Sequence, residues 1–504
     1  MIVSGMFRLA LGVLLTVAAY ELVRWLVVRR LRGWMHQSAV RFVRRHHIRM
    51  EAARFIDRVW IREALAQDRA IEEKILEVAR ATGESHRLLR DRVDAYVEEI
   101  APFFSLSAYY RFGASAAKRF LDFCFELVHE PGAFQRQAAE VPPNAVRVYV
   151  INHRANMDPA ILAYALLHHV PMSYAVGEWA LVWPLHTLFR MFGSYFVRRG
   201  EKDPLYHRVL ERFIQLIASH GAVTGFFPEG ALSRDGRLRR PRTGLLDYLI
   251  GLRREHPDRP IVFLPIGLNY DRVFEDHILV REKDGPIPKA TASERMRNLV
   301  GVIGWFPVLL GANLVKVATR SHRKFGNAAV VFGEPLHLDA WPGGAAIHTL
   351  PDPERRVALE ALGDELLRNR IGKVVPALPV PIFCTALLRE PAGELGALRR
   401  EVISVLAELR ARGAPVRFGR AFDPILARRQ QGNERLALLD DALIEAEEAD
   451  VVIQLATTLL LRRKLVRRVV TPAGPGVEAV AGAESLIAYY ANSIAHHFDL
   501  PHAS

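Results

Sequence analysis

The chain has 504 residues, of which 50% are hydrophobic and 24% are charged. This composition is typical of globular proteins with several domains, and it excludes a disordered or fibrous chain. The two cysteines, Cys124 and Cys384, exclude a disulfide scaffold and a cysteine-based zinc site, and they favour a reducing compartment. With 68 Lys and Arg against 55 Asp and Glu, the net charge is +13, which favours phosphate-bearing partners such as nucleic acid, anionic lipids or a phosphorylated small molecule.

An apolar segment lies near the N-terminus. Residues 9–28 carry only two charges, Glu21 and Arg24, and about 20 apolar residues suffice to cross a bilayer. Arginines cluster directly after the segment, so a span would place the rest of the chain in the cytoplasm. The segment fits a single span, an amphipathic helix on the membrane surface or a buried helix, and we expect residues 1–32 to form a membrane anchor or single span. A second apolar run, at 299–315, is too interrupted by glycine and proline to predict a span.

The next part of the chain, residues 33–141, is predicted to be a helical arm. Apolar residues recur at helical spacing over 54–83 and again over 84–100. Gly83 is placed to end the first of these segments, which we read as one helix.

Residues 142–350 have a different pattern, in which short β-rich runs alternate with helical stretches. This alternation predicts an α/β domain with a largely parallel sheet. The C-terminal region, 351–504, returns to a helical pattern, which extends through the basic run 459–470. The predicted strands are 146–151, 172–177, 194–199, 223–228, 261–268 and 328–333.

A histidine and an aspartate follow the first predicted strand. Asp158 precedes Pro159 and is placed to cap a helix, while His153 lies in the turn five residues earlier. The turn could bring the carboxylate to one ring nitrogen, leaving the other free to accept a proton from a substrate hydroxyl. The alternative is an aspartate that only caps and a histidine that only fills a turn.

Three more predicted strands end in unusual residues. Arg198 and Arg199 are adjacent and would point to opposite faces of a strand, so at most one faces a given pocket. Glu229 and Gly230 open a loop with six further polar or basic residues, which could clamp a phosphate or remain a solvated basic loop. Pro265 interrupts an apolar run and predicts a bulge or a sheet edge. The loop residues are Ser233, Arg234, Arg237, Arg239, Arg240 and Arg242.

In this order, the four clusters resemble the blocks of the glycerolipid acyltransferase family. NHRANMDP resembles its H-x-x-x-x-D block, and GSYFVRRG, FFPEGALSRDGRLRRPRTG and FLPIGLNYDRV resemble the next three. The long third block and the tail AYYANSIAHH are similar to the glycerol-3-phosphate acyltransferase branch. The resemblance implies an α/β acyltransferase core with a largely parallel sheet, preceded by a helical N-terminal arm and followed by a helical C-terminal region.

The resemblance implies transfer of a fatty acyl group to the sn-1 hydroxyl of glycerol 3-phosphate, giving lysophosphatidate for phospholipid synthesis. The donor would be acyl-CoA or acyl-carrier protein as co-substrate, with no cofactor and no metal. His153 would be the general base and Asp158 its orienting partner. The implied substrate-binding residues are Arg198, Glu229, Gly230, Ser233, Arg234 and Pro265.

The chain departs from the family pattern in its third block, where Pro228 and Leu232 replace an aliphatic residue and an arginine. Dihydroxyacetone phosphate or a lysophospholipid therefore remains an alternative acceptor, and a non-catalytic basic protein that binds membrane or nucleic acid is the alternative class. For the enzyme we expect contact with anionic lipids, none with nucleic acid, and a place on the cytoplasmic face of the inner or plasma membrane.

Overall fold

The structure is a computed structural model that describes residues 58–101, 119, 121–130, 132–166, 172–177, 195–198, 200–283, 324–391, 393–419 and 441–498. The predicted anchor at 1–32 and the apolar run 299–315 lie outside these residues. Within the described ranges, no helix is long and apolar enough to cross a membrane. The chain divides into two compact units, Met1–Ala116 with Val176–Val209, and Ala117–Ala175 with Leu210–Ser504.

The first unit contains a helical arm. The segment read as one helix is two, α3 (Arg58–Ala66) and α4 (Arg69–Thr82), because the Asp68 side chain accepts hydrogen bonds from the first amides of α4 and starts a new helix there. Gly83 ends α4 with a φ of 73°, as predicted. Helix α5 (His86–Ile100), strand β4 (Tyr195–Val197) and the start of α10 (Pro204–Ser219) complete the described part of this unit.

The second unit is built on a largely parallel sheet, which confirms the predicted α/β class. Its strands run in the order β1-β7-β6-β2-β5-β3, and β8 also pairs with β6. The pairs β1–β7, β2–β6, β2–β5 and β3–β5 are parallel, whereas β6 is antiparallel to β7 and β8. The bounds are β1 Glu126–His129, β2 Val146–Ile151, β3 Met172–Gly177, β5 Val223–Phe226, β6 Ile261–Tyr270, β7 Asn327–Phe332 and β8 Leu336–His337.

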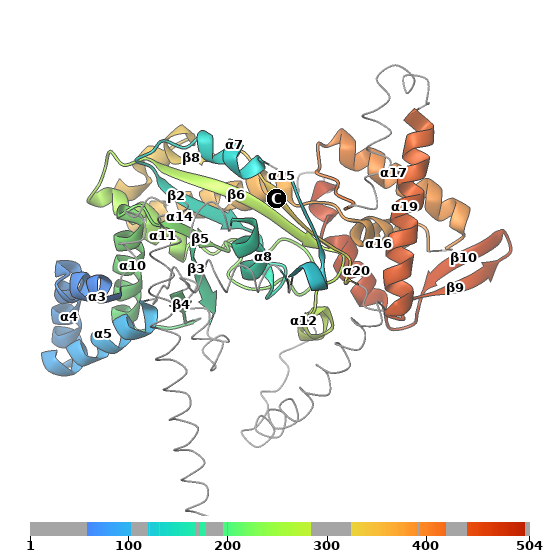
Figure 1. Cartoon of the computed structure of the whole chain (residues 1–504). Helices are drawn as coiled ribbons and strands as arrows, with labels where there is room; N and C mark the ends of the chain where they lie inside the picture. Colours follow the sequence, from blue (N-terminus) through green and yellow to red (C-terminus); the bar gives the residue numbers. More distant parts are fainter. Residues whose placement is uncertain are drawn as a thin grey trace, which may run out of the picture. The chain divides into compact units, whose positions relative to one another are not determined.

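All six predicted strands are present, and β1 and β8 were missed. Every residue of β6 is buried, and so is nearly all of β2. The two strands lie side by side in the sheet (Figure 1). Such continuous apolar strands are expected where both faces of a sheet are covered. The helices around this sheet are α7 (Ala133–Ala139), α8 (Asp158–Ala165), α11 (Gly244–Gly251), α12 (Asp276–Lys283) and α14 (Asp352–Asp364), with short turns η3 (Leu252–Arg254), η4 (Leu338–Ala340) and η5 (Gly344–Thr349).

Pro265 is neither at a sheet edge nor at the end of its strand. It lies in the middle of β6, beside Val150 of β2. On the other side of β6, the pairing with β8 ends at Phe263 and the pairing with β7 begins at Ile266. The Pro265 carbonyl accepts a hydrogen bond from Gly333 on that side, and the N–H that proline lacks would point the same way, into the gap between the two partners. The proline is tolerated because the gap requires no donor.

In its described residues, the C-terminal region is helical apart from one hairpin. Helix α16 (Pro379–Arg389) is almost fully buried and packs against α17 (Leu395–Ala411), α19 (Asp441–Arg462) and α20 (Glu484–Asn492). The predicted helix over 459–470 is wrong beyond Arg462, because Lys464 has a φ of 56° and strand β9 (Val466–Thr471) follows, paired with β10 (Gly474–Ala479). The π-helix η6 (Glu365–Ile371), α15 (Gly372–Val374) and η9 (Ala495–His497) complete the region.

A close approach between β6 and the C-terminal region gives a test of this packing. A Cβ atom added to Gly267 of β6 would lie 2.1 Å from the Val374 carbonyl oxygen. Because backbone must move to admit it, Gly267→Ala is expected to lower the free energy of unfolding by about 1–3 kcal/mol. Gly244→Ala is the control, since its Cβ would meet no atom within 4 Å. Thermal melts of the two variants should differ; equal melting temperatures would contradict the packing described.

Candidate active site

The polar residues of the second unit gather where β2, β5 and β6 end. Asn152, the first residue after β2, donates a hydrogen bond to the Leu268 carbonyl (2.8 Å) and accepts one from the Leu268 amide (2.7 Å). The fully buried side chain of Asn152 thus fastens the end of β2 to β6. Carboxyl ends of parallel strands commonly carry the binding sites of α/β proteins.

His153 and Asp158 are in hydrogen-bond contact, as their spacing predicts. The His153 Nδ1 atom lies 2.9 Å from the Asp158 Oδ2 atom. The same oxygen accepts hydrogen bonds from the amides of Arg154 (2.7 Å) and Ala155 (3.0 Å). The Tyr270 hydroxyl, at the end of β6, donates to the other carboxylate oxygen. A fully buried charge is thereby surrounded by donors.

The predicted helix cap is wrong. Asp158 is the first residue of α8 rather than the residue before it, and no side chain caps this helix. Side chains of helical residues lean toward the N-terminal end, so the Asp158 carboxylate reaches back to the turn that carries His153. Its role is to hold that turn and the imidazole.

The second nitrogen of the imidazole is available. The His153 ring stacks on Phe227, with ring centroids 4.1 Å apart and planes at 19°. Its side chain is 10% exposed, and no described residue forms a hydrogen bond with Nε2. A fixed imidazole with one free nitrogen can take a proton from a hydroxyl group.

Tyr270 is a site residue that the sequence reading missed. Burial and the neighbouring Asp158 carboxylate raise the pKa of its hydroxyl well above the ordinary value, so the group remains a donor to Asp158. An aromatic residue at the end of the strand that contains Pro265 was the available signal, but its contact with Asp158 spans 112 positions of sequence.

Glu229 joins the His153 turn to the basic loop. One carboxylate oxygen accepts a hydrogen bond from the His153 amide (2.8 Å) and the other accepts one from the Arg239 amide (2.9 Å). Burial raises the pKa of this carboxyl, and the two amides oppose that shift. A substrate-binding role for Glu229 stays a prediction; the contacts present make it a link between two segments.

Of the other predicted loop residues, Ser233 and Gly230 make contacts within the loop, whereas Arg234 pairs with a residue outside it. Ser233 is buried and works inside the loop, donating to the Arg237 carbonyl (2.7 Å) and accepting from the Gly236 amide (3.0 Å). Gly230 has a φ of 65° and lies against the Arg242 side chain. Arg234 is half-exposed and forms an ion pair with Glu282 at 3.2 Å.

The basic loop lines a cavity of about 990 Å³. No described residue pairs with the side chains of Arg240, Arg242 or Lys283, so three cations on its wall are available to an anion. The sequence predicted the loop arginines but not Lys283 and Arg368, which come from α12 and η6. The charged lining consists of Arg234, Arg237, Arg239, Arg240, Arg242, Lys283 and Arg368 with Asp235, Glu360 and Asp364.

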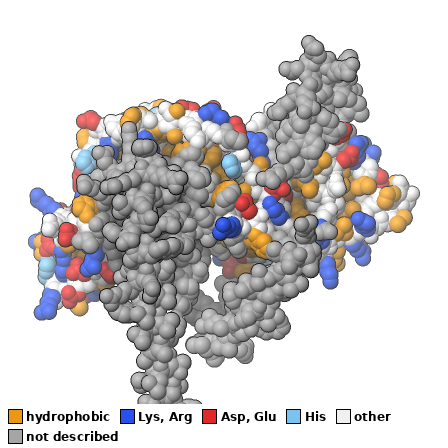
Figure 2. Space-filling view, viewed as in Figure 1, with side chains coloured by type: hydrophobic (Ala, Val, Ile, Leu, Met, Phe, Trp, Pro, Cys, Tyr) orange, Lys and Arg blue, Asp and Glu red, His pale blue; other side chains and the backbone are white. Residues whose placement is uncertain are grey.

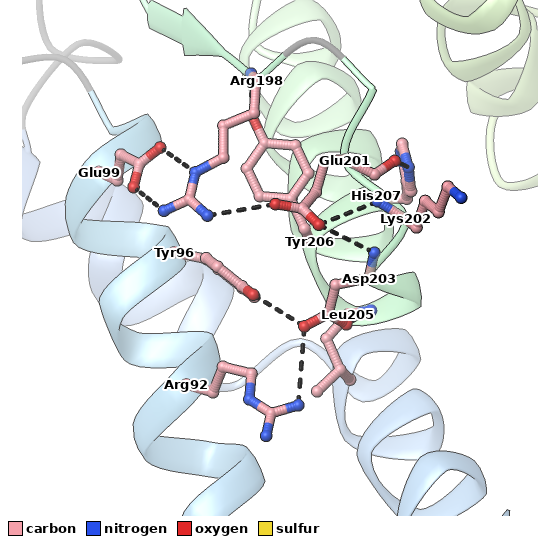
Figure 3. Close-up of polar contacts among 10 residues, drawn as sticks. All are labelled: Arg92, Tyr96, Glu99, Arg198, Glu201, Lys202, Asp203, Leu205, Tyr206 and His207. Carbon is pink, nitrogen blue, oxygen red and sulfur yellow. Dashed lines mark hydrogen bonds and ion pairs between the residues drawn. The ribbon is translucent and has the colours of Figure 1, made fainter. Parts of the chain in front are cut away.

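Arg198 belongs to the first unit, whereas the other predicted site residues belong to the second. Its guanidinium donates to Glu99 (2.8 Å from Nε) and to Glu201 (3.2 Å), and it lies near the rings of Tyr96 and Tyr206 (Figure 3). The Glu99 hydrogen bond raises the pKa of Arg198 above its ordinary value. Contact of Arg198 with a substrate stays a prediction, and its neighbour Arg199 lies outside the described residues.

Comparison with known proteins finds two matching families and two similar relatives. The Acyltransferase family matches residues 135–268, and the family described as the glycerol-3-phosphate acyltransferase C-terminal region matches residues 312–423. A glycerol-3-phosphate acyltransferase of Aeromonas hydrophila is 30% identical over 349 residues, and one of Shewanella loihica is 28% identical over 285 residues. These matches support a likeness of this chain to acyltransferases of the glycerol-3-phosphate acyltransferase type.

The matches are partial in length. They cover 67% and 55% of this chain but only 40% and 32% of the two relatives. Among solved structures, the 1-acyl-sn-glycerophosphate (LPA) acyltransferase PlsC from Thermotoga maritima is 15% identical, covering 61% of this chain and 97% of its own. The TM-score is 0.27, which is too low to support an argument about this chain.

The contacts of Asp158 predict the effect of a conservative change. In Asp158→Asn, the amide oxygen can accept from the His153 turn while the amide nitrogen donates to the Tyr270 hydroxyl, so the fold should be kept. The negative charge that stabilises a protonated His153 is lost. We expect a wild-type melting temperature and turnover reduced by about two or more orders of magnitude. Unchanged turnover would refute the orienting role of Asp158.

The two acceptor oxygens of Glu229 predict a different result for Glu229→Gln. Glutamine offers one acceptor oxygen, so either the His153 or the Arg239 amide loses its partner, at a cost of about 1–3 kcal/mol. Melting temperature and kcat should fall together. Glu282→Gln is the control, because Glu282 pairs only with half-exposed Arg234 among the described residues. A raised KM for the acceptor with an unchanged melting temperature would instead support direct substrate binding.

Proposed function

We propose that this chain is a glycerol-3-phosphate 1-O-acyltransferase that makes lysophosphatidate. The observation that carries the proposal is a His153 imidazole whose Nε2 bonds no described residue. Glu229 links it to the wall of a cavity where Arg240, Arg242 and Lys283 pair with no described residue. The cavity offers charge to a phosphate, and the imidazole offers a base to a hydroxyl. Glycerol 3-phosphate carries both groups, and the names of the curated relatives support this acceptor.

The reaction needs no protein nucleophile. His153 Nε2 takes the proton of the sn-1 hydroxyl as its oxygen attacks the thioester carbonyl of the donor. A C–O bond forms and the C–S bond breaks, and the departing thiolate receives the proton from the imidazolium. Asp158, held by two amides and the Tyr270 hydroxyl, stabilises the imidazolium while it carries the proton.

The donor is acyl-CoA or acyl-carrier protein, used as co-substrate without a further cofactor. The proposed place of the enzyme is the cytoplasmic face of the inner or plasma membrane, in contact with anionic lipids and not with nucleic acid. The apolar segment at 9–28, followed by its arginines, supports this placement. The lipid product supports it too.

Two alternatives make different predictions. Dihydroxyacetone phosphate and lysophospholipids share the phosphate, so only turnover distinguishes them as acceptors. A non-catalytic basic protein would need charge alone, and it leaves the His153–Asp158–Tyr270 arrangement without a purpose. Basic and acidic side chains intermingle over the described surface shown in Figure 2, which is a poor match to an extended polyanion on that face.

The proposal is tested by acyl transfer with the detergent-purified full chain. Palmitoyl-CoA is supplied with glycerol 3-phosphate, dihydroxyacetone phosphate or lysophosphatidate in parallel, and His153→Ala is expected to lose about two to four orders of magnitude in kcat. Arg240→Ala with Arg242→Ala should raise the KM for glycerol 3-phosphate about tenfold or more. Arg467→Ala, on the exposed hairpin, is the matched control. A carrier-protein donor is tried with the same acceptors, and no His153-dependent turnover with either donor would refute the proposal.

A further inference from the structure

The C-terminal tail, residues 484–498, contacts all three strand ends that form the site. Asn492 donates a hydrogen bond to the Asp235 carbonyl in the basic loop (2.8 Å). Asn269 of β6 donates to the Ser493 hydroxyl (3.2 Å). The Tyr489 ring lies 5.0 Å from the guanidinium of Arg154, the residue that follows His153.

The contact with the basic loop is unusually close. Gly236 has a φ of 92°, and a Cβ atom there would lie 2.0 Å from the Tyr489 carbonyl oxygen. Only glycine fits such a position without moving backbone. The loop and the tail therefore pack closely through main-chain atoms as well as through side chains.

Arg154 connects this junction to the catalytic turn. Its amide donates to Asp158, and its Nη1 donates to the Gly236 carbonyl. The side chain is 2% exposed, and no described carboxylate forms an ion pair with it. A buried guanidinium needs compensation for its lost hydration, and the face of the buried Tyr489 ring supplies part of it.

We propose that the tail is a positioning element for the catalytic turn, acting through the Tyr489 ring on Arg154. The tail touches neither His153 nor a reacting atom among the described contacts. It fixes the side chain of Arg154 from one end, while the backbone of the same residue binds Asp158. The expected effect on kcat rests on the proposed function. The expected effect on the structure of the turn rests on the contacts alone.

The test compares two substitutions at one position. The Tyr489 hydroxyl has no described partner, so Tyr489→Phe keeps the ring over Arg154 and should retain kcat within about twofold. Tyr489→Leu keeps an apolar side chain but removes the ring face, and kcat should fall about tenfold or more. The KM for both substrates should stay unchanged, because the ring binds neither. Ser485→Ala, an exposed change on the same helix, is the control.

A second measurement does not depend on activity. Hydrogen exchange of the Arg154 and Ala155 amides, which donate to Asp158, should quicken in Tyr489→Leu and not in Tyr489→Phe. If the wild type acylates no glycerol 3-phosphate, the proposed function fails while the exchange experiment still tests the tail. If Tyr489→Leu has the same amide exchange rates and the same kcat as the wild type, the positioning role is refuted.

Asn492→Ala provides a second test of the tail in case Tyr489→Leu fails to fold. It removes one partly buried hydrogen bond to the loop, and kcat is expected to fall about fivefold with KM unchanged. A fall in melting temperature with no change in kcat would identify the tail as a merely stabilising segment and would also overturn the proposal.

Discussion

The buried carboxylate of Asp158 is the constraint on which the site depends. A charge without solvent contact must be met by donors, and four converge on it: the His153 ring, the amides of Arg154 and Ala155, and the Tyr270 hydroxyl. Three come from the turn after β2 and one from the end of β6. Satisfying the charge therefore fixes the shape of the turn, the orientation of the imidazole and the position of one strand end relative to another.

The parts of this arrangement that the sequence predicted are local. The strands of the sheet appeared as short apolar runs because both faces of β2 and β6 are covered, and the His153–Asp158 contact followed from a spacing of five residues. The residues that were missed act across long separations. Tyr270 meets Asp158 and Tyr489 meets Arg154 only through the sheet order and the path of the tail, and neither is encoded in a local pattern.

The errors have other causes, because a propensity was outweighed by a specific contact or backbone conformation. Asp158 before a proline fits a helix cap by propensity. In the structure its carboxylate instead forms hydrogen bonds with the buried His153 ring and two amides of the preceding turn. The basic run 459–470 has helical periodicity until Lys464 turns the chain through a left-handed conformation into a hairpin. Pro265 predicts a bulge or a sheet edge; it is not at an edge, yet a gap between two partners on one side of a central strand removes the same hydrogen-bond requirement.

The acyltransferase match at 135–268 contains His153 and Asp158, yet it does not contain all the residues that hold this pair in place. Tyr270 lies two residues beyond that match, and Tyr489, Asn492 and Ser493 come more than two hundred residues later. Without the tail, the Arg154 guanidinium would lose its aromatic neighbour and Asn269 would lose one acceptor inside the core. A buried polar group left without a partner costs about 1–3 kcal/mol. The turn that carries His153 therefore packs against the C-terminal tail within one compact unit.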